Sequence, residues 1–203
     1  MTALEIADII GIICFAASGF LIAVHYKLDI LGIFIASFLT ALGGGMIRDV
    51  LANKTPFIFT HNLPVTLVVV TVLLSLLFKL HKIADFESKT AFIISDAVGL
   101  VSFAITGSIV AIENGFNFLG VLILAFLTAV GGGTIRDILI NRVPSILVSE
   151  FYATVALIVA LIVYVLDLLE YRSLLSLTIV FIFGVALRLL AYYKNWHLPT
   201  LSK

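Results

Sequence analysis

The chain has 203 residues, of which 62% are hydrophobic, and its mean hydropathy of +1.24 excludes a soluble globular domain. Twelve Lys and Arg residues balance twelve Asp and Glu residues. The sequence has no basic cluster interleaved with aromatic residues, which argues against nucleic-acid binding. Composition therefore predicts a membrane protein.

Seven apolar runs are long enough to cross a hydrocarbon core of about 30 Å. In chain order they cover residues 4–25, 29–52, 62–82, 91–113, 117–141, 149–169 and 172–194. Short polar segments such as HYKLD at 25–29 and ENGFN at 113–117 separate them. We therefore expect an all-α membrane protein with seven transmembrane helices and no extramembrane domain.

The sequence of the first three spans is repeated in the next three. DIIGIICFAASG reappears 88 residues later as DAVGLVSFAITG, and 23 of the 52 positions from Asp8 to Phe59 match those from Asp96 to Leu147 without a gap. Because each copy holds an odd number of spans, the second copy must be inserted in the opposite orientation. The sequence thus predicts a three-helix repeat at 1–90, an inverted three-helix repeat at 91–170, and a seventh helix and tail at 171–203 used for packing or assembly.

Positive charges favour one side of the membrane. The side that holds the C-terminus carries Lys27, Lys79, Lys82, Lys89, Arg142, Lys194 and Lys203. The other side carries only Lys54 and Arg172. By the positive-inside rule we expect a multi-pass protein of the inner (plasma) membrane with its N-terminus outside and its C-terminus in the cytoplasm.

The second and fifth spans each contain three consecutive glycines at equivalent positions. These are Gly43, Gly44, Gly45, Gly131, Gly132 and Gly133. Each costs roughly 1 kcal/mol of helix propensity relative to Ala, and backbone groups freed in lipid must be buried in protein or hydrated. We therefore expect helices two and five to be broken at GGG, beside the path of a substrate or ion. Close packing between helices is the alternative use of the same glycines.

An Arg-Asp pair follows each glycine triplet: Arg48 and Asp49 in the first copy, Arg136 and Asp137 in the second. A charge inside a span costs about 2.5 to 3.5 kcal/mol, so these groups should face the bundle interior and be paired or hydrated. Because adjacent helical residues point in different directions, we expect pairing across the repeats, Arg48 with Asp137 or with carbonyls of helix five, and Arg136 in the reverse sense. A network that only locks the bundle is the alternative.

Further polar residues recur in both copies. Asp8 and Asp96 are expected to cap helix N-termini, with ion binding as the alternative. Thr40 and Thr128 could offer hydroxyl groups to a passing ion or bond back to their own helices.

The remaining reactive residue types form no recognisable site. Cys14 is the only cysteine, and the four histidines have no ligand spacing, so we expect neither a metal site nor a cofactor. No nucleophile with a base and an orienting partner is present, and the chain does not read as an enzyme.

The doubled GGGMIRD and GGGTIRD motifs, with the 3+3+1 span count, resemble the prokaryotic members of the TRIC family, the trimeric intracellular cation channels. The resemblance extends from about Glu5 to Tyr193. It implies a homotrimer in membrane lipid, with one pore in each protomer between kinked helices two and five, conducting monovalent cations and mainly potassium. The glycines match the kinks of the family, and the Arg-Asp pairs match residues near its constriction. Animal members bind a phosphoinositide through a Lys-containing motif that GGGMIRD does not match.

The same doubled domain also resembles bacterial membrane proteins named glycine transporters. A transporter of glycine or another small amino acid is therefore the alternative to a cation channel. A purely structural bundle is disfavoured by the duplicated buried charges.

Overall fold

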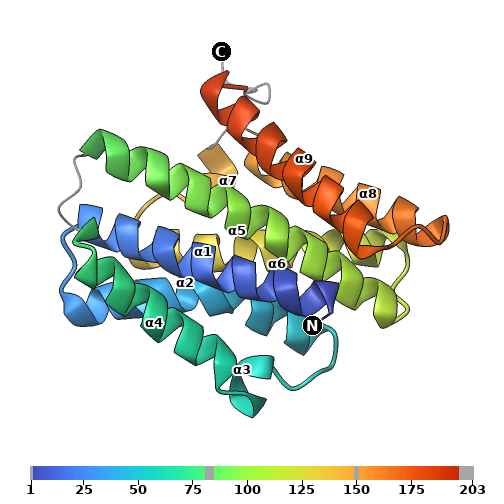
Figure 1. Ribbon diagram of the computed structural model, residues 1–203, viewed down its shortest axis with the longest axis horizontal. Coiled ribbons are helices and arrows are strands. Elements are labelled where there is room, and N and C mark those ends of the chain that lie inside the picture. Colours follow the sequence, from blue (N-terminus) through green and yellow to red (C-terminus); the bar gives the residue numbers. More distant parts are fainter. Residues whose placement is uncertain (1, 81–84, 149–150, 197–203) are drawn as a thin grey trace.

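The computed structural model describes residues 2–80, 85–148 and 151–196, with no account of the side chains of 85–88. These residues form a helical bundle (Figure 1). Its helices are α1 (Ala3–His25), α2 (Ile30–Leu51), α3 (Phe57–Thr60), α4 (Leu63–Leu77), α5 (Asp85–Glu113), α6 (Phe118–Leu139), α7 (Ser145–Val148), α8 (Tyr152–Leu168) and α9 (Leu174–Tyr193). The all-α class predicted from the sequence is confirmed.

Local sequence explains where the repeated helices begin. Asp29 caps α2 by accepting a hydrogen bond from the backbone amide of Gly32, and Asn117 caps α6 through the equivalent bond to Gly120. Thr2 forms a capping box with Glu5 at the start of α1. The two repeats therefore use the same signal to start their second helix.

Among the described residues, five helical segments are long and apolar enough to cross a membrane: α1, α2, Lys89–Glu113 within α5, α6 and α9. The other two predicted spans correspond to α4 and α8, which are apolar but only 15 and 17 residues long. A one-turn helix, α3 or α7, lies just before each of these two predicted spans. Residues 149 and 150, predicted to open the sixth span, lie outside the described residues.

The two repeats pack against each other through equivalent helices. Helix α1 packs on α5 and α2 on α6, while α1 with α2 and α5 with α6 form matching contacts inside each repeat. Phe15 of α1 and Phe103 of α5, which are repeat partners, meet edge to face with ring centroids 5.2 Å apart. Because each residue contacts its own repeat partner, this contact lies at the pseudo-two-fold axis that relates the two repeats.

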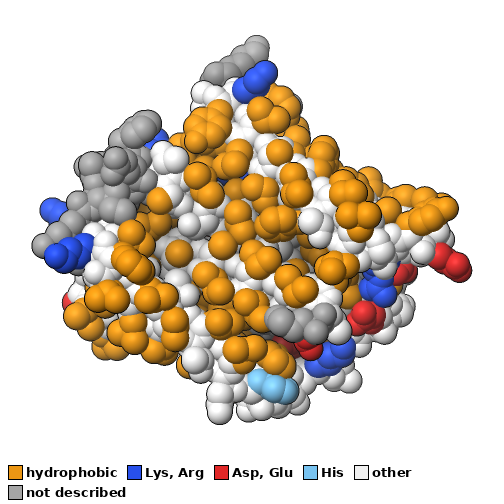
Figure 2. All heavy atoms as spheres, viewed as in Figure 1, with side chains coloured by type: hydrophobic (Ala, Val, Ile, Leu, Met, Phe, Trp, Pro, Cys, Tyr) orange, Lys and Arg blue, Asp and Glu red, His pale blue; other side chains and the backbone are white. Residues whose placement is uncertain are grey.

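Helix α9 lies outside the repeat and breaks its symmetry. It packs against α5 and α8 of the second repeat, whereas α4 packs on the α1 side of the bundle (Figure 1). Hydrophobic side chains cover most of the face seen in Figure 2, with most of the charged side chains at its edges. This distribution is the one expected of helices that cross a bilayer side by side.

The predicted breaks at the glycine triplets are not observed. Helices α2 and α6 continue through Gly43, Gly44, Gly45, Gly131, Gly132 and Gly133. The reason is the close crossing of the two helices, because a Cβ on Gly44 would collide with the carbonyl oxygen of Thr128, and a Cβ on Gly132 with that of Thr40. Tight packing, the alternative use of these glycines, is therefore the one the structure has.

Candidate functional site: two arginine–aspartate clusters

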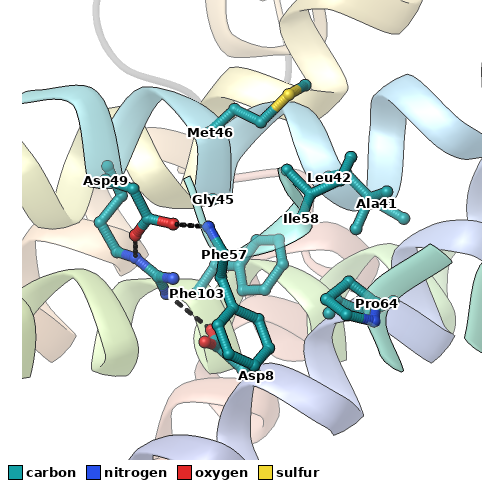
Figure 3. Close-up of a pocket in the computed structure, with 12 residues that line it drawn as sticks. Asp8, Ala41, Leu42, Gly45, Met46, Asp49, Phe57, Ile58, Pro64 and Phe103 are labelled. Carbon is teal, nitrogen blue, oxygen red and sulfur yellow. Dashed lines mark hydrogen bonds and ion pairs between the residues drawn. The ribbon is translucent and has the colours of Figure 1, made fainter. Parts of the chain in front are cut away.

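The first cluster is centred on Arg48 of α2. Its Nη1 donates to Oδ1 of Asp8 on α1 at 2.7 Å and to the hydroxyl of Thr106 on α5 at 3.1 Å. Its Nε donates to Oδ1 of Asp49 at 2.9 Å. The other Asp49 oxygen accepts the backbone amide of Phe57 at 2.9 Å, which ties α3 to the cluster (Figure 3).

The second cluster repeats this arrangement around Arg136 of α6. Nη1 donates to Asp96 at 3.0 Å and to the hydroxyl of Ser18 at 2.8 Å, and Nε donates to Asp137 at 3.0 Å. The second Asp137 oxygen accepts both the backbone amide and the hydroxyl of Ser145, each at 2.8 Å. Equivalent residues of the two repeats therefore make equivalent bonds.

The predicted pairing of each arginine across the repeats is wrong. Arg48 pairs with Asp8 and Asp49 of its own repeat, and Arg136 does the same with Asp96 and Asp137. The long arginine side chain folds back beside its own helix, which brings its Nε to the aspartate that follows it. Only the hydroxyl partners of the two arginines, on α5 and α1, come from the opposite repeat.

The role predicted for Asp8 and Asp96 is also wrong. Helix α1 begins at Ala3 and is capped by Thr2, so Asp8 lies inside the helix, and Asp96 likewise lies well inside α5. The sequence does contain a sign of their role, because both repeats carry a carboxylate at the same position of an apolar span. A charge inside a span is costly to insert into a membrane, so each carboxylate needs a partner in the bundle. Both aspartates belong to the arginine–aspartate clusters, a role that sequence analysis did not predict for them.

The threonines near the glycine triplets hydrogen-bond to their own helices. Thr40 donates to the carbonyl of Ala36 at 2.5 Å, and Thr128 donates to that of Leu124 at 2.6 Å. Both side chains are fully buried where α2 crosses α6. Bonding back to the helix, one of the two predicted roles, is therefore present.

The first cluster lines a pocket that opens to the surface and has a volume of about 30 Å³, enough for one or two water molecules. Figure 3 shows the side chains that surround it. Polar groups of Asp8, Arg48 and Asp49 face it among apolar side chains. The pocket is lined by Asp8, Ile12, Ala41, Leu42, Gly45, Met46, Arg48, Asp49, Phe57, Ile58, Pro64 and Phe103. Charged groups that would be costly in lipid thus border a space large enough for water.

The second cluster is more deeply buried than the first. The side chain of Asp96 is 7% exposed against 18% for Asp8, and Arg136 is 0% exposed against 5% for Arg48. Gly133 is buried, whereas its partner Gly45 is half-buried. The two clusters share their bonds and differ in how deeply they are buried.

The chain matches a known membrane-protein family. A family model described as "Glycine transporter" matches residues 5–80 and again 93–167. The UPF0126 membrane protein YvgT of Bacillus subtilis is 35% identical over 198 residues, which cover 98% of this chain and 96% of that protein.

Solved channel structures have the same fold. A prokaryotic TRIC channel crystallised in 0.5 M KCl superposes with a TM-score of 0.88 at 35% identity, covering 96% of this chain and 98% of that one. The TRIC trimeric intracellular cation channel orthologue from Rhodobacter sphaeroides also gives a TM-score of 0.88, at 28% identity, covering 96% of this chain and 100% of that one.

Proposed function

This chain belongs to the membrane-protein family whose model is described as "Glycine transporter", and it has the fold of the prokaryotic TRIC channels. On that premise we propose that it is a channel for monovalent cations, chiefly potassium. The observation that carries the proposal is the near full-length likeness to TRIC channels at a TM-score of 0.88.

The charge of the two clusters supports a cation as the substrate. Each cluster holds two carboxylates and one guanidinium, Asp8 and Asp49 with Arg48 in the first, and so carries a formal charge of −1. A net negative charge in a site of low dielectric attracts a cation and repels an anion. Glycine, with its own carboxylate, gains less from such a site than potassium does.

We assign the pathway to the α2–α6 region between the clusters. The crossing contains Thr40 and Thr128 and the six glycines, and each helix carries one Arg-Asp pair beyond its triplet. In this proposal Asp8 and Asp96 join the Arg-Asp pairs as residues that the ion passes, and the closely packed glycines are where the path must widen during conduction.

The same premise extends to assembly and topology. We propose a homotrimer in the inner (plasma) membrane, with a pore in each protomer, the N-terminus outside and the C-terminus cytoplasmic. Of the lysines behind this orientation, Lys82 and Lys203 lie outside the described residues. Chemical cross-linking of the purified protein in detergent should give a ladder that ends at three copies, and a ladder that ends at two would exclude the trimer.

The test is electrical. Purified protein in a planar bilayer under a tenfold KCl gradient should show discrete current steps that reverse near the cation equilibrium potential, about 59 mV for a perfectly selective pore. Glu113→Gln, which removes an exposed carboxylate that belongs to neither cluster, should leave the reversal potential unchanged. Saturable glycine uptake into liposomes with no potassium current would contradict the channel and identify a transporter.

A further inference from the structure

The two clusters differ at one repeat position that faces them. Pro64, near the start of α4, lines the pocket of the first cluster. Its partner 88 residues later is Tyr152, the first residue of α8. A small ring in one repeat is thus replaced by a large aromatic side chain in the other.

Tyr152 occupies, beside the second cluster, the space that is open beside the first. A Cβ built on Gly133 would lie 3.4 Å from the Tyr152 hydroxyl oxygen and 3.6 Å from Nη2 of Arg136. A Cβ built on the equivalent Gly45 would have only Arg48 within 4 Å, at 3.9 Å. Tyr152 itself is 3% exposed, so its side chain fills the second site.

Helix α9 holds this tyrosine from outside the repeat. The guanidinium of Arg188 lies over the Tyr152 ring, 4.9 Å from its centroid, and is 5% exposed. One turn earlier, Gly184 lets α9 approach closely, because a Cβ there would lie 2.8 Å from Val159 of α8 and 2.9 Å from Val101 of α5. Helix α9 packs on α5 and α8, so this support is built onto the second repeat.

The closed arrangement leaves polar groups unpaired. Within the described part of the chain, neither the Tyr152 hydroxyl nor Nη2 of Arg136 has a partner in hydrogen-bonding geometry, although both are buried and Asp96 lies near the hydroxyl. Water entering the second site would satisfy both groups, which favours an open form. Against this, the Arg188 cation holds the ring and adds a positive charge beside the cluster, which disfavours a passing cation. Opposing contributions of this kind are what a site that opens and closes requires.

We propose that Tyr152 is the gate of the pathway at the second cluster and that Arg188 of α9 keeps it closed. The inference rests on the proposed channel function for its consequence, which is control of ion flow. The site it describes, open at the first cluster and closed at the second, is defined by packing alone and can be tested without measuring current.

Two matched cysteines report the access of water to each cluster. Cys14, the only native cysteine, is first replaced by serine, the residue found at its repeat partner Ser102. Gly45→Cys and Gly133→Cys then place a thiol beside each cluster, and a Cβ at either glycine meets no atom closer than 3.4 Å. A charged, water-soluble methanethiosulfonate reagent is applied to the folded protein in detergent, and the modification rate of each thiol is measured.

The thiol at Gly133→Cys should react about tenfold or more slowly than that at Gly45→Cys, since it is reached only from a minor open form. Adding Tyr152→Ala or Arg188→Ala should raise the modification rate at Gly133→Cys toward that at Gly45→Cys. Equal rates before these changes, or an unaltered slow rate after both, would overturn the gate.

Two milder variants keep the test decisive if an alanine variant does not fold. Tyr152→Phe retains the ring and removes the unpaired hydroxyl, so it should slow modification at Gly133→Cys further. Pro64→Tyr copies the gate into the first repeat and should slow modification at Gly45→Cys. If neither rate changes, the gate is excluded.

Current measurements separate this inference from the function on which it rests. Tyr152→Ala should raise the open probability of the channel several-fold. Protection at Gly133→Cys without any potassium current would leave the gate standing and remove the channel. Potassium current with equal thiol reactivity in both repeats would support the channel and exclude the gate.

Discussion

Arg48 and Asp8, on α2 and α1, form an ion pair of 2.7 Å that recurs in the second repeat as the 3.0 Å pair between Arg136 and Asp96. The first pair borders a pocket and the second is buried. A buried ion that loses its partner is destabilised more than a hydrated one. Identical substitutions in the two repeats should therefore have unequal effects.

Asp96→Asn should lower the free energy of unfolding by about 3 to 5 kcal/mol, because it leaves Arg136 buried with one carboxylate fewer. Asp8→Asn should cost about 1.5 kcal/mol, since water from the pocket can replace the lost carboxylate. Thermal unfolding of the two purified variants in the same detergent measures the difference. Equal losses would show that the pocket does not hydrate the first pair.

Arg48→Gln should leave an assembled oligomer and increase the preference for cations, because the first cluster changes from one guanidinium with two carboxylates to two carboxylates alone. Arg136→Gln should reduce the yield of intact oligomer, since it leaves two carboxylates buried without their cation. Size-exclusion chromatography followed by bilayer recording gives both results. An assembled Arg48→Gln protein with unaltered selectivity would remove Arg48 from the pathway.

Gly44→Ala should destabilise the fold by about 3 kcal/mol or more, because the added methyl group collides with the backbone of Thr128 and forces α2 and α6 apart. Gly132→Ala should do the same through Thr40. Gly45→Ala is the matched control, with room for a methyl group and a gain of up to about 1 kcal/mol in helix propensity. Similar stability of all three variants would contradict close packing as the role of the triplets.

A fluorescent protein fused after Lys203 should fluoresce, whereas a periplasmic alkaline phosphatase at the same point should stay inactive, because the C-terminus is expected in the cytoplasm. The reporters are compared in intact bacteria at equal expression. The opposite pair of results would reverse the topology and place the first cluster's pocket on the cytoplasmic side.

Sequence reasoning located the helices and the charged residues but not their partners. The 88-residue repeat and the apolar runs reflect burial and length, which are encoded position by position along the chain. Whether Arg48 meets Asp137 or Asp8 depends on how each helix is rotated and on how far an arginine side chain reaches, and neither is local. The glycine triplets support two opposite readings, an opened helix or a close crossing, and the choice depends on the helix that packs against them.

The packing of Tyr152 and Arg188 beside the second cluster could not be predicted from the sequence alone. Tyr152 and Arg188 lie in α8 and α9, 36 residues apart, and nothing in their spacing relates them. The difference between Pro64 and Tyr152 is visible in the sequence once the repeat is aligned. Its meaning depends on knowing that both positions face an arginine cluster, which only the fold supplies.

The contact between Phe15 and Phe103 has the form of an interface between two identical chains inserted in opposite directions, since each residue meets its own copy. Two separate identical chains would have to carry the same residue at both clusters, and any substitution would alter both clusters at once. Joining the copies in one chain removes that restriction. It allows a proline to stand beside the first cluster and a tyrosine beside the second, so that two sites built on the same scaffold can differ independently.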